Sequence, residues 1–249
     1  MSKDAFAKVP EVTLGFWIVK VLVTTLGETG GDAITMSMQL GYAAGTAIFL
    51  VLFAAAVAVQ VRAERFHPFP YWAAIIMSTT VGTTLADLVD RSLGIGYAGG
   101  STLLVLLLLA SLALWKRSTG SIDMGSVAST RSEAFYWVTI AFSQTLGTAL
   151  GDWTADSAGL GYAGSAVLFG SLLLLVALAY FRTSISRTVL FWAAFVLTRP
   201  LGAVVGDFLD KPLQHGGLGL SRYVASVVLL ALVVMLVMAL PQRPARRAH

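Results

Sequence analysis

The sequence contains no cysteine, so disulfide bonds and thiolate metal sites are excluded. Its three histidines, His67, His215 and His249, all lie outside the long apolar runs. This placement argues against haem, a histidine-ligated zinc centre and a serine–histidine hydrolase within the bilayer. No nucleophile–base pair, cofactor motif or phosphate-binding glycine loop is evident, and we therefore expect no enzymatic activity and no bound cofactor.

Charged residues are also scarce. They make up 12% of the 249 residues, against roughly a quarter in soluble domains, while 57% of the residues are apolar. Apolar runs recur along the whole length, so the chain is not a soluble body with one signal peptide or anchor. The net charge of +4 does not indicate a nucleic-acid partner, because the basic residues lie mostly in short connections between apolar runs. The composition predicts an all-α, multi-pass membrane protein whose main partner is the lipid bilayer.

A four-fold internal repeat organises the sequence. Each copy has an aromatic pair ending in tryptophan, a glycine ten residues later and an aspartate fifteen residues later. The tryptophans are Trp17, Trp72, Trp137 and Trp192, the glycines are Gly27, Gly82, Gly147 and Gly202, and the aspartates are Asp32, Asp87, Asp152 and Asp207. Three copies continue with Gly-Tyr-Ala around Tyr42, Tyr97 and Tyr162, whereas the fourth has an insertion at 211–219. Recurrence of this spacing indicates internal duplication.

Each repeat supplies two apolar segments of about 20 residues, the length that crosses a bilayer. The predicted spans are 14–35, 43–62, 71–90, 97–116, 135–155, 162–181, 189–209 and 221–240. We accordingly divide the chain into an N-terminal segment 1–12, repeats one and two 13–116, a linker 117–132, repeats three and four 133–240, and a basic tail 241–249.

Basic residues predict the orientation of these spans. One side of the predicted membrane carries Lys3, Lys8, Arg62, Arg65, Lys116, Arg117, Arg131, Arg182, Arg187, Arg243, Arg246 and Arg247. The other side carries Arg91, Lys211 and Arg222. Because lysine and arginine concentrate in cytoplasmic loops, we expect both termini in the cytoplasm. Every two-helix unit then begins on the same side, so the four repeats are parallel copies.

The repeated aspartates are the first candidates for a functional site, because a carboxylate within a span is costly. Residues eight, eleven and fifteen after each tryptophan share one helix face. They are Thr25, Glu28 and Asp32 in repeat one, Thr80, Thr83 and Asp87 in repeat two, and Thr145, Thr148 and Asp152 in repeat three. Repeat four has Pro200 and Ala203 before Asp207, with Arg199 beside the proline. Carboxylate and hydroxyl oxygens suit hard cations, so we predict a metal-binding set of Glu28, Asp32, Asp87, Asp152 and Asp207.

The depth of the aspartates leaves an alternative. If the aromatic pairs form a belt at the cytoplasmic interface, each aspartate lies about 22 Å further along its helix, near the extracytoplasmic mouth. It could then cap a helix end instead of binding an ion. Further inward, the same helix face becomes apolar, with Val21, Ile76, Ala141 and Val196. This change predicts a closed apolar gate.

Two basic residues lie within the predicted spans. Lys20 is only three residues after Trp17, so we expect its side chain to reach back to the interface. Arg199, next to a helix-kinking proline, is the better candidate for an internal partner of the acids. Glu28 and Asp32 are four residues apart and could form a two-carboxylate site.

The Trp-x9-Gly-x4-Asp motif, with its following Gly-Tyr-Ala, resembles a bacterial family of membrane proteins built from four tandem two-span repeats. That family is known as a repeat of unknown function, or as uncharacterised membrane-anchored proteins. The resemblance covers residues 12–240. It implies eight spans and a place in the bacterial cytoplasmic membrane, and it brings no activity.

The residues themselves favour a transporter or exporter of a small cation, foremost a divalent metal such as Mn²⁺ or Mg²⁺, with proton coupling as an option. Two alternatives stay open: a carrier of a small organic solute, and a non-transporting membrane scaffold or partner subunit. The sequence leaves the ion, the direction of transport and the formation of a homo-oligomer undecided.

Overall fold

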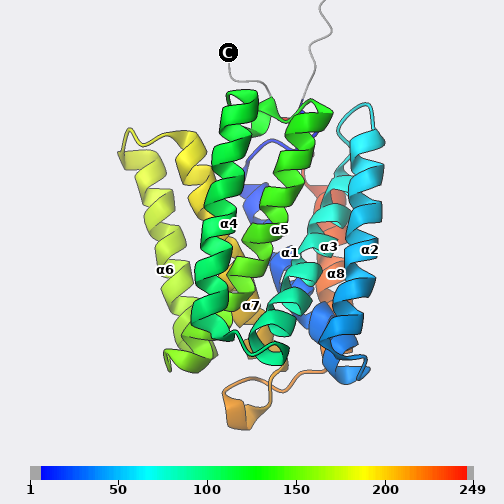
Figure 1. Cartoon of the computed structure of the whole chain (residues 1–249), viewed down its shortest axis with the longest axis vertical. Helices are drawn as coiled ribbons and strands as arrows, with labels where there is room; N and C mark the ends of the chain where they lie inside the picture. The colour runs from blue at the N-terminus through cyan, green and yellow to red at the C-terminus, as the bar shows by residue number, and fades with distance from the viewer. Residues whose placement is uncertain (1–6, 246–249) are drawn as a thin grey trace, which may run out of the picture.

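The computed structural model describes residues 7–245, and within this range the chain forms eight long α-helices (Figure 1). They are α1 (Leu14–Asp32), α2 (Gly41–Arg62), α3 (Pro68–Asp87), α4 (Gly96–Thr119), α5 (Thr130–Asp152), α6 (Gly161–Arg182), α7 (Arg187–Asp210) and α8 (Arg222–Ala239). Each predicted span overlaps one of these helices, so the all-α class is confirmed. Lys3, Arg246, Arg247 and His249 lie outside the described residues.

Six of the described helices, α2, α3, α4, α6, α7 and α8, are long and apolar enough to cross a membrane. Hydropathy thus supports six spans, two fewer than the repeat predicts. The other two, α1 and α5, contain more polar residues; α1 alone carries Lys20, Glu28 and Asp32. The molecule is consistent with a multi-pass membrane protein in which these two helices are the most polar.

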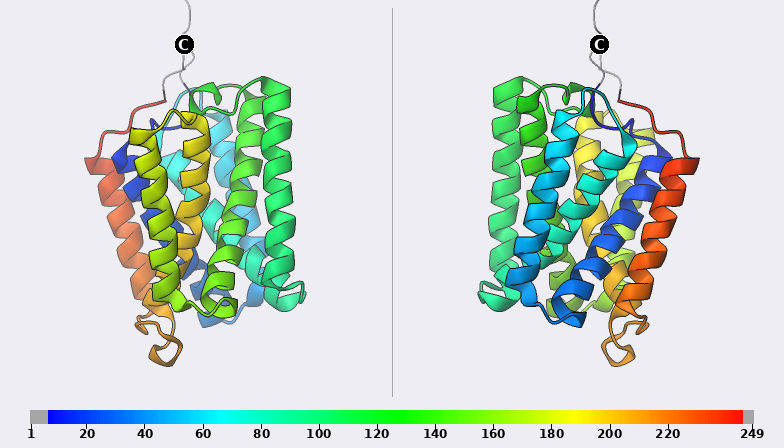
Figure 2. Two further views of the ribbon diagram at one scale, coloured as in Figure 1. Left: turned by 90° about the vertical axis from the view of Figure 1, so that its left-hand side faces the viewer. Right: turned by 90° about the vertical axis from the view of Figure 1, so that its right-hand side faces the viewer.

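The odd-numbered helices form a closed inner ring, and the even-numbered helices lie outside it (Figures 1 and 2). Around the ring α1 packs on α3, α3 on α5, α5 on α7, and α7 on α1. Each even-numbered helix packs mainly on the odd helix of the next repeat: α2 on α3, α4 on α5, α6 on α7, and α8 back on α1. A repeat is therefore not a self-contained hairpin, because its two helices serve different positions of the ring.

The motif glycines allow the ring helices to approach closely. Each one faces the residue that stands seven positions after the next tryptophan around the ring: Gly27 faces Thr79, Gly82 faces Gln144, Gly147 faces Arg199, and Gly202 faces Thr24. A Cβ on Gly27 would lie 2.1 Å from Oγ1 of Thr79, and one on Gly202 would lie 2.1 Å from Oγ1 of Thr24. The same contact is thus made four times around the ring.

A π-helical turn follows the motif aspartate in repeats one to three: η1 (Ala33–Ser37), η2 (Leu88–Ser92) and η4 (Trp153–Ser157). The even helix then starts at a glycine with positive φ, which other residues adopt at a cost; these are Gly41, Gly96 and Gly161. This requirement explains the glycine of Gly-Tyr-Ala. In repeat four α7 instead continues to Asp210, and the insertion forms a longer connection containing the short 3-10 helix η5 (Leu213–His215).

The aromatic pairs lie inside the bundle, toward the end that holds the chain termini. Phe16, Tyr71, Trp72, Tyr136, Trp137, Phe191 and Trp192 are all buried in one cluster. The hydroxyls of Tyr71 and Tyr136 are hydrogen-bonded at 2.7 Å. These rings pack against one another inside the bundle and do not face outward as a belt.

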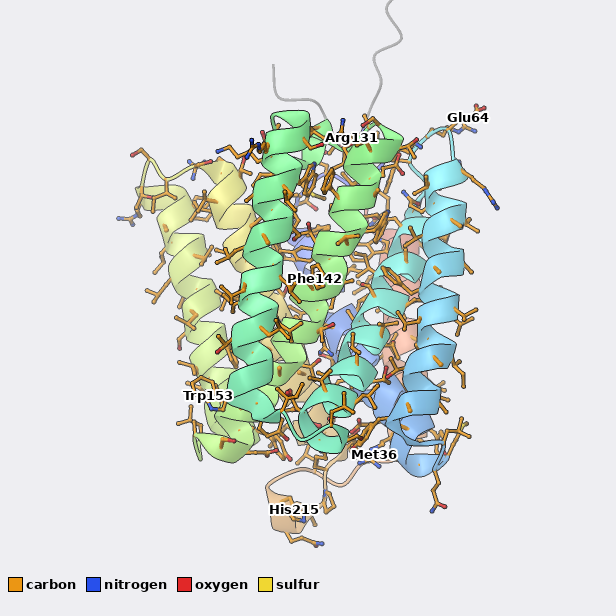
Figure 3. The ribbon with its side chains drawn as sticks, in the orientation of Figure 1. Met36, Glu64, Arg131, Phe142, Trp153 and His215 are labelled. Carbon is orange, nitrogen blue, oxygen red and sulfur yellow. The ribbon has the colours of Figure 1, made fainter. Side chains whose placement is uncertain are left out.

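Segments from both ends of the chain cover this aromatic cluster. Glu11 donates its backbone N–H to the carbonyl of Arg243 at 2.8 Å, so the N-terminal segment runs beside the C-terminal one. Lys8 donates its backbone N–H to the carbonyl of Val127 at 3.0 Å, which ties in the connection between α4 and α5. That connection, predicted as a linker, includes the 3-10 helix η3 (Met124–Ser126). We call this end of the bundle the termini end, and the opposite end, where Met36, Trp153 and His215 lie, the far end (Figure 3).

Candidate functional site

Between the aromatic cluster and the far end, the ring helices point four successive layers of side chains inward. Residues three, seven, eleven and fifteen after each tryptophan are spaced by four, so they share one helix face. The apolar layer consists of Lys20, Ile75, Ile140 and Phe195; the central layer of Thr24, Thr79, Gln144 and Arg199; the threonine layer of Glu28, Thr83, Thr148 and Ala203; and the aspartate layer of Asp32, Asp87, Asp152 and Asp207. Each of these residues is at most 3% exposed.

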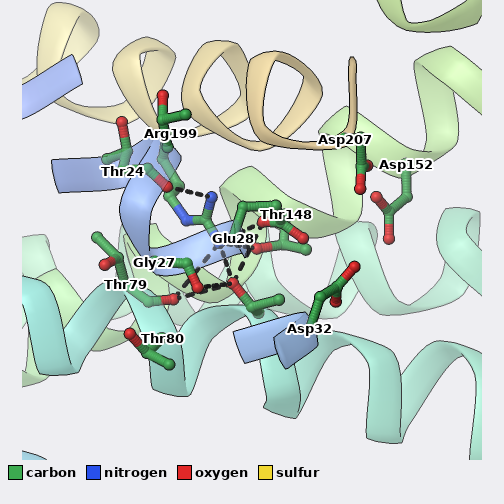
Figure 4. Close-up of polar contacts among 12 residues, drawn as sticks. Thr24, Gly27, Glu28, Asp32, Thr79, Thr80, Thr148, Asp152, Arg199 and Asp207 are labelled. Carbon is green, nitrogen blue, oxygen red and sulfur yellow. Dashed lines mark hydrogen bonds and ion pairs between the residues drawn. The ribbon is translucent and has the colours of Figure 1, made fainter. Parts of the chain in front are cut away.

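Arg199 connects all four ring helices. Its Nη2 donates to Oε2 of Glu28 at 2.9 Å and to the hydroxyls of Thr83 at 2.6 Å and Thr148 at 2.5 Å (Figure 4). Nη1 donates to the backbone carbonyl of Thr24 at 3.4 Å. A buried guanidinium needs a charged partner and several acceptors, and this arrangement supplies both. The prediction that Arg199 has an internal acidic partner is confirmed.

The room for Arg199 comes from Gly147 on the neighbouring α5. A Cβ on that glycine would lie 2.2 Å from Cγ of Arg199, a distance that no real contact allows. The next residue, Pro200, lies inside α7 and cannot donate a helical hydrogen bond. The arginine therefore lies where two helices come unusually close and where one of them lacks a backbone N–H donor.

Two basic residues bridge the four motif aspartates in pairs. Arg91 contacts Asp87 at 2.7 Å through Nε and Asp152 at 3.2 Å through Nη2. Nζ of Lys211 lies 3.0 Å from Asp207 and 2.5 Å from Asp32. Each bridge joins two neighbouring helices of the ring.

The alternative that the aspartates cap helix ends fails in the structure. Asp32, Asp87 and Asp152 each precede a π-helical turn, but none makes a capping hydrogen bond there. Their carboxylates face the basic bridges instead. The aspartates therefore belong to one ionic layer at the far end of the ring.

Further acids extend this layer. Arg222 contacts Asp210 at 3.2 Å and Asp32 at 3.7 Å. Asp90 is buried, and neither of its carboxylate oxygens has a hydrogen-bond partner among the described residues. The network holds six buried carboxylates, Glu28, Asp32, Asp87, Asp152, Asp207 and Asp210, and four cationic groups, Arg91, Arg199, Lys211 and Arg222.

The charge of Lys211 is held by its neighbours. Burial opposes the charge on this ammonium, but the carboxylates of Asp207 and Asp32 outweigh burial and raise the pKa of Lys211 well above its usual range. Lys211 lies just after α7, at the start of the repeat-four insertion. Lys211 therefore remains positively charged at the far end.

Three carboxylates come close enough to bind one metal ion. Glu28, Asp32 and Asp207 each offer an oxygen, and these oxygens lie within 4.8 Å of one another. Asp87 and Asp152, the other members of the predicted metal set, are paired through Arg91. Lys211 and Arg199 now contact the three-carboxylate group, so a cation could bind there only if both basic side chains moved away.

The predicted threonines divide into two groups. Thr83 and Thr148 accept hydrogen bonds from Arg199 in the threonine layer. Thr25, Thr80 and Thr145 instead donate to carbonyls four residues earlier on their own helices, at 3.0, 2.9 and 3.0 Å. These three hydroxyls therefore bond their own helix and not the ionic network. The residues one position earlier, Thr24, Thr79 and Gln144, belong to the central layer.

Lys20 does not reach the interface. It is 0% exposed, and its Nζ lies 4.1 Å from the centre of the Phe195 ring. The predicted extension to the membrane surface is therefore wrong, because the side chain of Lys20 is directed into the bundle, toward Phe195. The residues of the predicted gate, Val21, Ile76, Ala141 and Val196, are only partly buried, and the closed layer lies one position earlier along each helix.

Sequence reasoning used Arg91, Lys211 and Arg222 only to orient the spans and missed their place in the site. A signal was present in the repeats. Arg91 and Lys211 both stand four residues after the motif aspartate, and each follows an acid, Asp90 or Asp210. Repeats two and four share this pair and repeats one and three lack it, so the site has a two-fold pattern within a four-fold ring.

Comparison with known proteins accounts for the repeat. The family described as Repeat of Unknown Function (DUF347) matches residues 15–66, 70–121, 135–186 and 190–241. No curated protein and no solved structure matches the chain. Since the four matched segments cover most of the sequence and coincide with the four repeats, the chain belongs to the DUF347 repeat family.

Proposed function

We propose that this protein is a membrane transporter or exporter of a small hard cation, with Mn²⁺ and Mg²⁺ as the first candidates. The observation that carries the proposal is the buried group of Glu28, Asp32 and Asp207, whose carboxylate oxygens lie within 4.8 Å of one another. Oxygen-only sites of this kind suit hard divalent cations.

The charge balance of the network supports the same function. Its carboxylates outnumber its cationic groups, and buried charges of one sign in excess attract mobile ions of the other sign. Arg199 and Lys211 pair with the three-carboxylate group in the present arrangement. In our proposal the transported cation takes their place, and they return when it leaves.

Access to the group is easiest from the far end. The side chain of Arg91 is 32% exposed and that of Arg222 is 20% exposed, so both reach from the aspartate layer toward solvent. In the opposite direction the apolar layer and the aromatic cluster close the ring. A transport cycle would need a second state in which the aromatic cluster opens.

We further propose that all eight helices cross the bacterial cytoplasmic membrane, with both termini inside. The polar side chains of α1 and α5 face the inside of the ring, so these helices can cross the membrane without exposing them to lipid. The cysteine-free chain allows a direct test with single cysteines at Glu64 and Asp156, which lie at opposite ends of the bundle. In intact cells a membrane-impermeant maleimide should label only the Asp156→Cys variant; labelling of only Glu64→Cys would contradict the orientation.

The transport proposal is tested by Mn²⁺ flux into proteoliposomes. We expect Glu28→Gln, Asp32→Asn and Asp207→Asn to reduce flux by about tenfold or more, because even loss of a group that only orients a metal ligand costs about 10–100-fold. Asp156→Asn is the matched control, because that acid is exposed and lies outside the network. Unchanged flux in all three variants would overturn the proposal. If flux is absent and a stoichiometric partner co-purifies, the scaffold alternative is favoured.

One observation favours the second candidate, a carrier of small organic solutes. A largely apolar cavity of about 650 Å³ lies between α1, α6 and α7, toward the termini end, and Trp17, Phe191 and Arg187 contribute to its walls. This volume is in the range that binds small molecules. Thermal-shift screening separates the two candidates: a cation transporter should be stabilised by Mn²⁺ or Mg²⁺, and a solute carrier by organic compounds.

A further inference from the structure

Lys20 is a single basic residue in an otherwise apolar layer. The corresponding residues of the other repeats are Ile75, Ile140 and Phe195. Lys20 is fully buried, and its Nζ has no hydrogen-bond partner among the described residues. Its nearest compensation is the face of Phe195, 4.1 Å away, which replaces only part of the lost hydration of an ammonium.

Within residues 7–245, one charged group bears on Lys20. From α7 it meets Phe195 and, one helical turn further, Arg199. The equivalent layers of α3 and α5 contribute Ile75 and Ile140, followed toward the termini end by Tyr71 and Tyr136. The buried residues of α8, which packs on α1, are all apolar. On α1 itself the nearest acid is Glu28, two turns away on the same face.

We propose that Lys20 is the proton-binding residue of the transport cycle, and that it gives up its proton when a cation displaces Arg199 from Glu28. This inference rests on the proposed function and names the coupling ion and its site.

The coupling follows from the column of charges on the ring axis. Glu28 now neutralises Arg199 at 2.9 Å. When a cation takes over Glu28, the guanidinium remains buried without its partner, about one turn from Lys20. Two like charges in a buried environment repel strongly, and arginine does not release its proton, so the amine of Lys20 does. The proton passes to water, and it is taken up again when the cation leaves and Arg199 returns to Glu28.

A purely structural role would not select lysine at this position. Isoleucine fills the same place in two other repeats, where it packs without burying a charge. The substitution Lys20→Ile therefore converts repeat one to a side chain that the fold already uses. Lys20→Arg keeps a positive charge that cannot be released, which provides a second and independent variant.

The experiment measures Mn²⁺ binding by calorimetry and proton release with a pH indicator, both on the purified full chain in weakly buffered detergent. Carboxylate ligands also release protons when a metal binds, so the wild type and the variants should all release some. We expect Lys20→Ile and Lys20→Arg to release about one proton fewer per bound Mn²⁺ than the wild type. Lys116→Gln, which changes an exposed lysine, should match the wild type.

The outcomes separate this inference from the proposed function. Mn²⁺ binding with the same proton release in Lys20→Ile and wild type would overturn the role of Lys20 and leave cation binding in place. Absence of binding of both Mn²⁺ and Mg²⁺ by the wild type would overturn the proposed function and this inference together. Loss of one proton in both variants, with binding retained in Lys20→Ile, would establish it.

Discussion

Nη2 of Arg199 lies 2.9 Å from Oε2 of Glu28, and this pair joins the fourth repeat to the first across 171 positions of sequence. Both side chains are buried, and the same nitrogen also reaches α3 and α5 through Thr83 and Thr148. The pair thus belongs to a set of polar contacts around Arg199 that reaches all four repeats.

Removal of one partner of this pair should destabilise the protein strongly. Arg199→Met leaves Glu28 as an uncompensated buried charge, and we expect a loss of about 3–5 kcal/mol in the free energy of unfolding. The double variant Glu28→Gln/Arg199→Met removes both charges and should recover a large part of this loss. Unfolding in detergent, followed by circular dichroism, compares the wild type with both variants. A double variant less stable than Arg199→Met would contradict the prediction.

The motif glycines should not tolerate a methyl group. A Cβ on Gly82 would lie 2.8 Å from the backbone carbon of Gln144, so α3 and α5 would have to separate. We expect Gly82→Ala to lower stability by about 1–3 kcal/mol.

Gly170 provides the control, because nothing lies within 4 Å of a Cβ built there on α6. Gly170→Ala should leave stability unchanged or raise it by about 0.5–1 kcal/mol, through the lower entropy of the unfolded chain. Equal effects of the two substitutions on the melting temperature would show that the close helix contact does not matter.

Lys211 should compete with a bound cation. Its Nζ contacts Asp32 and Asp207, two of the three carboxylates in the candidate metal site. We expect Lys211→Gln to increase Mn²⁺ affinity by about tenfold, or about 1.4 kcal/mol. Arg91→Gln should have a smaller effect, because Arg91 bridges Asp87 and Asp152 in the other half of the ring. Calorimetric titration gives both values, and a weaker affinity in Lys211→Gln would count against displacement of the lysine.

The tyrosine pair in the aromatic cluster allows a double-mutant cycle. Tyr71→Phe or Tyr136→Phe alone removes the 2.7 Å hydrogen bond and leaves one buried hydroxyl unpaired, at a cost of about 1–3 kcal/mol. The double variant leaves no unpaired hydroxyl and should lie close to the wild type. Repeats one and four already have Phe16 and Phe191 at this position, so the packing accommodates phenylalanine. Additive losses in the melting temperature would argue that the hydroxyls have other partners.

The features that recur in all four sequence repeats could be predicted from the sequence. Helix positions, the conserved spacing to Asp32 and its equivalents, and the inward face near Glu28 all repeat with the tryptophans, so one consistent interpretation fitted four copies. The internal partner of Arg199 followed from the cost of an unpaired charge within a span.

The remaining features depend on contacts between repeats, which a single sequence does not contain. Nothing in the sequence shows that α2 packs on α3. Nor does it show that Lys211, which follows α7, reaches Asp32 at the end of α1. The error on Lys20 had one cause. Tryptophan was taken as a marker of the membrane surface, whereas the aromatic rings fill the interior and place the lysine among them.

The packing of α8 on α1 has a consequence for the synthesis of the chain. Helix α1 precedes in sequence both α7 and α8, which pack on it, so Glu28 must wait for α7 to supply Arg199. Until then α1 carries a lysine, a glutamate and an aspartate that the finished ring buries. Stable folding of the first repeat is therefore tied to the arrival of the fourth, and an interrupted chain leaves the polar face of α1 uncovered.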